Sequence, residues 1–245
     1  MSALDGRVEN LLHIPFELDF ETLRQKVRVK TGSPSERELQ HLAQEAVAVA
    51  KPKAGYRVST VDARGEDHVI VDRVQLTSRV LRANLQPGQS VFPYLATCGL
   101  ELEAWSNAFS DILHRYWAET IKEMALDTAY AALTSHLLQH HHPGKTAGLS
   151  PGSIEDWQLT QQEALFNIFG SQTDALGVQL TPSMLMLPTK TVSGIRFPSD
   201  AGFESCQLCP RQACPRRRAD YDECLYIKYQ PEPVPAPYSP TGGVP

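Results

Sequence analysis

The sequence has no apolar run long enough to cross a membrane and no excess of basic residues. A membrane-spanning helix needs roughly 20 consecutive apolar residues, and no run in this chain of 245 residues approaches that length. The first ten residues contain acids and no apolar stretch, so we do not expect a secretory signal there. The net charge is −5, and clustered Lys and Arg that would contact phosphates are lacking. These absences predict a cytoplasmic protein with no membrane or nucleic acid partner.

Several motifs of enzymes are also missing. The sequence contains no Gly-x-Ser-x-Gly segment of a hydrolase, no phosphate-binding loop and no dinucleotide-binding fingerprint. We therefore assign no catalytic residue to this chain. Hydrophobic residues make up 42% of it, which is enough for one large domain, or for a domain with a small appendage.

The order of polar and apolar residues predicts helices mixed with short strands. The longest helical stretch covers residues 100–142, where apolar side chains recur three and four positions apart, and residues 107–111 are expected to divide it. Its small residues Ala125, Ala129, Ala131 and Ala132 indicate close packing against another element. Further helices are expected at 20–26, 33–50, 78–85 and 160–169, the last with a capping box of Thr160 and Glu163, and strands at 56–61, 68–71, 91–98, 177–180, 185–187 and 191–197.

Residues 149–197 carry an ordered set of short motifs. They are Leu149-Ser150-Pro151-Gly152-Ser153, Leu176-Gly177-Val178-Gln179-Leu180-Thr181-Pro182-Ser183, Met186-Leu187-Pro188 and Val192-Ser193-Gly194. In this order and spacing they resemble the activation domain of cobalamin-dependent methionine synthase. That family has a Pro-Gly turn, an Ile/Leu-Gly-x-x-Leu-Thr-x-Ser segment, a Met-x-Pro step and a Val-Ser-Gly strand.

The resemblance implies an α+β fold, with helices packed on a twisted antiparallel sheet. It also implies binding of S-adenosylmethionine and a role in the reductive methylation that restores inactive cobalamin to methylcobalamin, a reaction of methionine biosynthesis. The cofactor contacts would come from Ser150, Pro151, Gly152, Ser153, Ser193 and Gly194. The cobalamin would be carried by a partner, because this chain lacks an Asp-x-His-x-x-Gly motif and has no room for the other domains of a full synthase.

The sequence departs from the family pattern at ligand-binding positions. The family has an Arg three residues before the Pro of its turn, where this chain has Gly148, and a Tyr after the turn, where it has Ser153. The acid that the family carries on its long helix aligns near Ala131, and the nearest acid here is Asp127. Each lost charged partner would weaken binding by about 1.5–3 kcal/mol. Glu155, Asp156 or Lys145 could compensate.

Four of the five cysteines lie close together, with the spacing Cys-x2-Cys-x4-Cys-x9-Cys. Cysteine thiolates bind iron–sulfur clusters and structural zinc, and such a cluster is more typical of metal binding than of disulfides in a reducing compartment. An iron–sulfur cluster is favoured over zinc, although reduced cysteines without metal, or three cysteines with another ligand, also fit the spacing. The metal ligands would be Cys206, Cys209, Cys214 and Cys224.

Together these features predict three parts: residues 1–200 with the activation-domain fold, a Cys-rich metal-binding segment at 201–229, and a disordered Pro-rich tail at 230–245. The predicted function is that of an accessory subunit, which reactivates the cobalamin of a separate methionine synthase or other corrinoid methyltransferase. It would be part of a methyltransferase activity and would work with an electron donor. The alternative is a non-catalytic docking module in which the cysteines hold a structural zinc.

Overall fold

The computed structural model describes residues 7–199, 205–214, 217 and 219–229. The Pro-rich tail predicted at 230–245 lies outside the described residues. None of the helices within the described ranges is both long and apolar enough to cross a membrane.

The centre of the molecule is an antiparallel sheet built around β6 (Ser90–Thr97), which is buried at every position but its first. Its sequence, Ser-Val-Phe-Pro-Tyr-Leu-Ala-Thr, carries apolar or aromatic residues toward both faces, so both faces need a cover. β2 (Lys53–Arg57) and β3 (Ser59–Arg64) pair with one edge of β6, and β10 (Thr191–Pro198) pairs with the other. The sheet is completed by β1 (Val8–Leu11) beside β2, β4 (His68–Val71) and β5 (Val74–Thr77) beyond β3, and β7 (Thr146–Leu149) beside β10.

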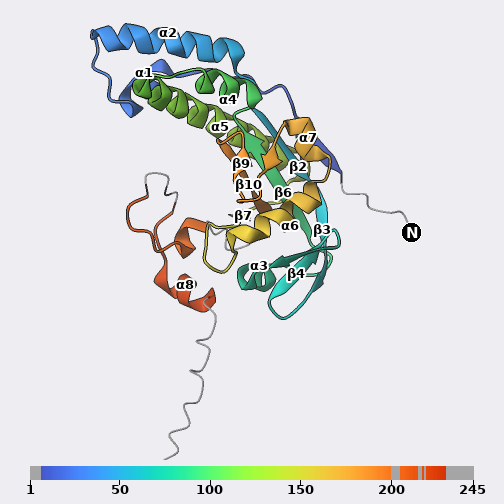
Figure 1. Ribbon diagram of the computed structural model, residues 1–245. Coiled ribbons are helices and arrows are strands. Elements are labelled where there is room, and N and C mark those ends of the chain that lie inside the picture. The colour runs from blue at the N-terminus through green and yellow to red at the C-terminus, as the bar shows by residue number, and fades with distance from the viewer. Residues whose placement is uncertain (1–6, 200–204, 215–216, 218, 230–245) are drawn as a thin grey trace, which may run out of the picture.

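Helices cover the two faces of this sheet and extend beyond one end of it. Figure 1 shows the helices α1 (Phe20–Lys26), α2 (Pro34–Val49) and α4 (Leu100–Asn107) gathered around the long helix α5 (Ile112–His141) at one end of the molecule. The short helix α3 (Arg79–Asn84) lies with β4 at the opposite end. The remaining helices are α6 (Gln162–Phe169), α7 (Gln172–Leu176) and α8 (Glu223–Tyr229), with 3-10 turns at Leu159–Gln161 and Ser205–Leu208, and a small strand pair is formed by β8 (Gln179–Leu180) and β9 (Met186–Leu187).

The long helix α5 contributes to two different cores. Its first half packs with α1, α2 and α4 through Trp117, Ile121 and Ala125, which are fully or almost fully buried. Its second half packs on one face of the sheet through Leu126, Ala129, Leu133 and Leu137. The predicted close packing is confirmed for Ala125 and Ala129, which have zero exposure, and is wrong for Ala131, which is exposed, while Ala132 is partly buried. A third core fills the other face of the sheet, under α3, α6 and α7.

Most of the predicted elements are present, and one predicted cap is wrong. The break at 107–111 is confirmed, because α4 ends at Asn107 and Asp111 caps α5 by accepting hydrogen bonds from Leu113 and His114. Thr160 and Glu163 do not form a capping box, since a 3-10 turn precedes α6 and its first residue follows Gln161, which makes no side-chain cap. The sequence reasoning missed β1, β5, β7 and α7, which are at most five residues long.

The end of α5 is joined to the sheet through a buried tyrosine. The hydroxyl oxygen of Tyr56 lies 3.0 Å from His136 Nδ1 and 3.0 Å from His141 Nε2. Burial lowers the pKa of both histidines below the ordinary value, which favours their neutral form. His141, near the C-terminus of α5, is therefore a hydrogen-bonded and preferentially neutral side chain.

Candidate ligand-binding site

A cavity of about 540 Å³ lies between the second half of α5 and the sheet. Its walls come from four separated parts of the chain: β6, α5, the turn after β7 with β10 beside it, and the cysteine segment. A volume of this size is within the range of small-molecule sites, roughly 300–1,000 Å³. The lining residues are Tyr94, Leu126, Asp127, Tyr130, Ser150, Thr191, Val192 and Cys206.

A glycine shapes the sheet side of this cavity. Gly194 of β10 pairs with Tyr94 of β6, and a β-carbon at position 194 would lie 2.6 Å from the Tyr94 hydroxyl and 2.8 Å from Ser150 Oγ. The absence of that carbon allows the two hydroxyl groups to approach each other to 3.4 Å. Gly194, predicted as a cofactor-binding residue, therefore makes room for polar groups that line the cavity.

Two tyrosine rings lie against each other in the cavity wall, inclined and not stacked. The ring centroids of Tyr94 and Tyr130 are 5.6 Å apart and the rings are inclined by 56°. Burial, with a smaller contribution from Tyr130, raises the pKa of Tyr94 above the ordinary tyrosine value. Tyr94 is therefore a neutral phenol over the physiological range, and a neutral phenol can donate a hydrogen bond as well as accept one.

The turn after β7 is held by its own hydrogen bonds. Ser153 N donates to Ser150 O over 3.0 Å, and Gly152 has φ +77° at the third position, as in a type II turn with Pro151 at the second. Ser153 Oγ also donates to Ser150 O over 2.6 Å, and Gly152 N donates to the carbonyl of the buried Trp157 over 2.7 Å. The amides of Gly152 and Ser153 are thus engaged within the protein.

The structure separates the six predicted cofactor-binding residues. Ser150 lines the cavity and Gly194 shapes it, while Gly152 and Ser153 line a neighbouring hollow of about 630 Å³ together with Cys209, Pro210 and Arg211. Side chains alternate along a strand, so Ser193 falls on the same face of β10 as the core residue Ile195, which is the face opposite to Val192. The cofactor contacts of these residues remain predictions.

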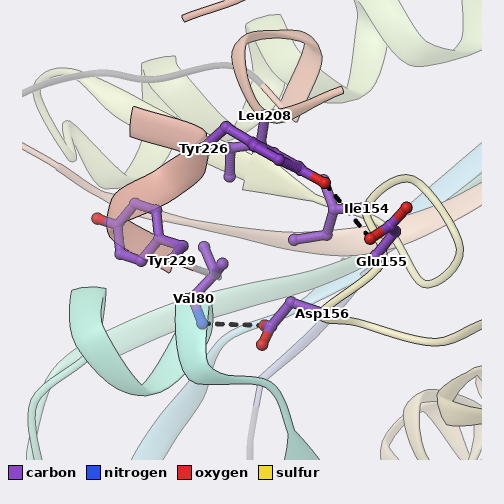
Figure 2. Close-up of a pocket in the computed structure, with 7 residues that line it drawn as sticks. All are labelled: Val80, Ile154, Glu155, Asp156, Leu208, Tyr226 and Tyr229. Atoms are coloured by element: carbon purple, nitrogen blue, oxygen red, sulfur yellow. Dashed lines mark hydrogen bonds between the residues drawn. The ribbon is translucent and has the colours of Figure 1, made fainter. Parts of the chain in front are cut away.

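Of the residues considered as replacements for missing charges, Asp127 alone lines the cavity. Asp156 caps α3 instead, because its carboxylate accepts hydrogen bonds from Ser78 Oγ, Arg79 N and Val80 N at 2.5, 3.2 and 3.0 Å. Glu155 accepts a hydrogen bond from the Tyr226 hydroxyl at 3.4 Å. Figure 2 shows both carboxylates beside a small hollow, about 30 Å³ in volume, at which the α8 tyrosines meet α3. Because the hollow has room for little more than water, we interpret it as a small gap in the packing between α8 and α3, and not as a ligand site.

The cysteine segment lies along both sides of the Ser150–Ser153 turn. Cys206 lines the cavity and Cys209 lines the neighbouring hollow, while Cys214 is half-buried and Cys224 is exposed on α8. The Arg217 guanidinium donates to the carbonyl oxygens of Cys206 and Cys209 at 2.8 and 3.1 Å. Arg217 thereby fixes the course of the loop.

The described cysteines do not fit a metal site as they are placed here. In the ranges that the structure describes, no three His, Cys, Asp or Glu side chains form a group that could hold a metal ion. No disulfide joins any of the five cysteines. The iron–sulfur cluster and the zinc site therefore remain predictions from the cysteine spacing, and we derive no chemical step from either.

Sequence reasoning missed two tyrosines of the cavity and an arginine that contacts one of them. Tyr94 and Tyr130 sit in segments expected to be core, and Arg196 was not considered, although it is the one charged residue in β10. A charged residue in an otherwise apolar strand was the available signal.

Comparison with known proteins finds a match among solved structures. No protein-family model and no curated protein matches the chain. Among solved structures, the crystal structure of the MetH reactivation domain bound to AdoHcy (S-adenosylhomocysteine) superposes with a TM-score of 0.57 at 15% sequence identity, and the match covers 78% of each chain. This similarity confirms the predicted fold, a twisted antiparallel sheet with packed helices as in the activation domain of methionine synthase.

Proposed function

We propose that this chain binds S-adenosylmethionine in the cavity between α5 and the sheet, and that it supports the reactivation of cobalamin held by a separate protein. The observation that carries the proposal is the convergence of Asp127, Ser150 and Tyr94 on one cavity, where Gly194 leaves room for the Tyr94 and Ser150 hydroxyl groups. Ser150 and Gly194 belong to the motifs that resemble the methionine synthase activation domain. The solved domain of similar fold is bound to S-adenosylhomocysteine, the demethylated form of the proposed ligand.

The cavity matches the chemistry of such a ligand. S-adenosylmethionine carries a sulfonium and an ammonium group, and Asp127 supplies a carboxylate on the α5 wall. The Tyr94 hydroxyl and Ser150 Oγ can donate hydrogen bonds to its oxygen and nitrogen acceptors. Leu126 and Val192 give the apolar surface against which a purine ring and methylene groups can pack.

The proposed role combines the binding of S-adenosylmethionine with the lack of a cobalamin-binding motif in this chain. When bound, S-adenosylmethionine supplies an electrophilic methyl group for the cobalt of the partner protein, and the electron comes from an external donor. The chain itself would orient the ligand and present it to the partner. The partner is a corrinoid protein or the catalytic subunit of a methionine synthase, and the active pair would carry out a methyltransferase reaction.

Binding is tested first, by titration calorimetry of the full chain with S-adenosylmethionine and S-adenosylhomocysteine. Asp127→Asn removes the negative charge, and we expect affinity for the cationic S-adenosylmethionine to fall about tenfold, the scale of one charge-assisted hydrogen bond. Asp174→Asn is the matched control, because Asp174 is an exposed acid on α7 that does not line the cavity. If neither ligand binds the wild-type chain, the proposal is wrong.

Reactivation is tested with a corrinoid methyltransferase that lacks its own activation domain. The inactive Co(II) form is mixed with the chain, a low-potential reductant and S-adenosylmethionine, and the spectrum of methylcobalamin is followed. We expect the methylated form to return only when all three are present, and more slowly with Asp127→Asn. Binding to the corrinoid protein without ligand binding or reactivation would instead support the non-catalytic docking module.

A further inference from the structure

Arg196 of β10 is a buried cation with no acidic partner among the described residues. Its exposed fraction is 8%, and none of the ion pairs in the described part of the chain includes it. A buried charge is normally paired, because removing it from water is costly unless an opposite charge compensates. An anionic ligand would therefore supply the negative charge that Arg196 lacks.

The guanidinium is held by neutral oxygen atoms. Nη1 donates to Thr146 Oγ1 at 2.7 Å and Nη2 donates to the Tyr130 hydroxyl at 3.1 Å. Nε is buried and has no hydrogen-bond partner. The guanidinium carbon lies 5.7 Å from the centroid of the Tyr130 ring. These contacts fix the position of the group and leave its positive charge unbalanced.

A missing side chain on the neighbouring strand makes room for the arginine. Gly148 of β7 pairs directly with Arg196 of β10. A β-carbon on Gly148 would meet Arg196 Cγ at 3.7 Å and no other described atom within 4 Å. The arginine stem therefore lies over Gly148, where a long side chain from β7 would compete with it.

Tyr130 connects this cation to the ligand cavity. Arg196 can only donate, so the Tyr130 oxygen accepts from it and its own proton is directed elsewhere. Tyr130 lines the cavity and lies beside Tyr94, whose hydroxyl approaches Ser150 Oγ. A hydrogen bond donated by a cation polarises the hydroxyl group that accepts it, and this makes the hydroxyl a stronger donor in turn. This corner of the cavity thus presents hydroxyl donors backed by a positive charge.

We propose that Arg196 and Tyr130 form an anion subsite that holds the carboxylate of the ligand's amino-acid part. Tyr130 and Asp127 are three residues apart on α5, so they project on the same side of the helix. The pair would take the carboxylate and the ammonium group of one α-amino acid, which are joined through a single carbon. Arg196 is a positioning residue for Tyr130. This inference rests on the proposed binding of S-adenosylmethionine. It identifies the amino-acid part of the ligand as the part that the site recognises.

The test compares two ligands that differ in that part. S-adenosylhomocysteine has the amino acid, whereas 5′-methylthioadenosine keeps the adenosine and the thioether and lacks both the carboxylate and the ammonium. In Arg196→Gln we expect affinity for S-adenosylhomocysteine to fall at least about tenfold, while affinity for 5′-methylthioadenosine changes less than about twofold. Arg196→Lys should recover part of the loss. Arg79→Gln, an exposed arginine on α3, is the control for removal of one positive charge.

Two further measurements separate a ligand subsite from a structural role. Tyr130→Phe removes one hydroxyl, and we expect the same selective loss for S-adenosylhomocysteine; it serves as the test if Arg196→Gln does not fold. Arg196→Met should raise the melting temperature of the ligand-free protein, because it removes an unpaired buried charge, and should abolish the stabilisation by S-adenosylhomocysteine. Equal losses for both ligands, or no loss in either variant, would overturn the subsite and leave S-adenosylmethionine binding intact. Failure of the wild-type chain to bind either ligand would overturn both proposals.

Discussion

Gly194 lies directly opposite Tyr94 in the ladder between β10 and β6, and no β-carbon fits between them. Such a carbon would come within 2.5 Å of the Leu149 carbonyl oxygen as well as 2.6 Å of the Tyr94 hydroxyl. The backbone carbonyl cannot move aside as a flexible side chain could. The shape of the cavity therefore depends on residue 194 having a hydrogen atom in place of a side chain.

Gly194→Ala should consequently destabilise the protein and weaken ligand binding. We expect the free energy of unfolding to fall by about 1–3 kcal/mol, the usual cost of overpacking, measured by urea denaturation. Gly148→Ala is the matched control on the neighbouring strand, because its β-carbon would make an ordinary contact at 3.7 Å. Equal losses in the two variants would contradict the steric explanation.

The contacts between Tyr56 and the two histidines should make stability depend on pH. Burial lowers the pKa of His136 and His141 from 6.5, so the unfolded chain binds these protons more readily than the folded protein. Their contribution to stability is complete above pH 6.5 and is lost as the pH falls through that value toward the lower folded pKa values. Urea denaturation between pH 8 and pH 5 should show a steeper loss in the wild type than in a double variant, His136→Gln with His141→Gln. His41→Gln, on the surface of α2, should keep the wild-type slope.

Ligand binding should protect Cys206 from alkylation. Cys206 lines the cavity, whereas Cys224 is exposed on α8 and lies outside it. At a concentration of S-adenosylhomocysteine about 100 times its Kd, only about 1% of the cavities are empty. Peptide mapping after brief iodoacetamide treatment should then show much slower labelling of Cys206 and unchanged labelling of Cys224. Unchanged labelling of Cys206 in a chain with bound ligand would place that ligand elsewhere.

Lys122 should be essential for holding α4 against α5 and the loop before β10. Its ammonium is 1% exposed and contacts Glu103, Glu119, Ser106 and Thr189 at 2.9, 2.5, 3.0 and 3.2 Å. Lys122→Met removes the buried cation and leaves the Glu103 carboxylate, which is 15% exposed, with the hydrogen bonds from Thr189, so we expect a loss of about 1–3 kcal/mol in the free energy of unfolding.

Lys190 provides a control for Lys122, because both side chains pair with the Glu119 carboxylate. Lys190 pairs with Glu119 at 3.4 Å but is partly exposed, so Lys190→Met should cost less than about 1 kcal/mol. Adding Glu103→Gln to Lys122→Met should recover part of the loss, because the remaining side chain is then neutral. A loss for Lys190→Met as large as that for Lys122→Met would show that burial does not decide the effect.

The sequence was informative where local chemistry determines structure. The helix expected at 33–50, the apolar periodicity of α5 and the division at 107–111 come from local signals, and the structure has each of them. The short strands β1 and β7 carry mixed burial and depend on partners distant in sequence. Their formation follows from pairing, which no local pattern specifies.

The same distinction applies to the cavity. Ser150 and Gly194 stand in recognisable motifs, and Asp127 is a visible acid on a helix. Arg196 is different, because its position over Gly148 depends on the register between β7 and β10. A one-residue shift in that register would turn its side chain to the other face of the sheet.

The walls of the cavity have a consequence for the synthesis of the protein. Tyr94 is made early, the α5 wall next, and Thr191 and Val192 only when β10 emerges. A chain that has not yet reached β10 has no enclosed site, so the ligand cannot assist the early steps of folding. It can stabilise only molecules whose central sheet is already assembled, and ligand-dependent protection from proteolysis would therefore report completed folding of nascent chains.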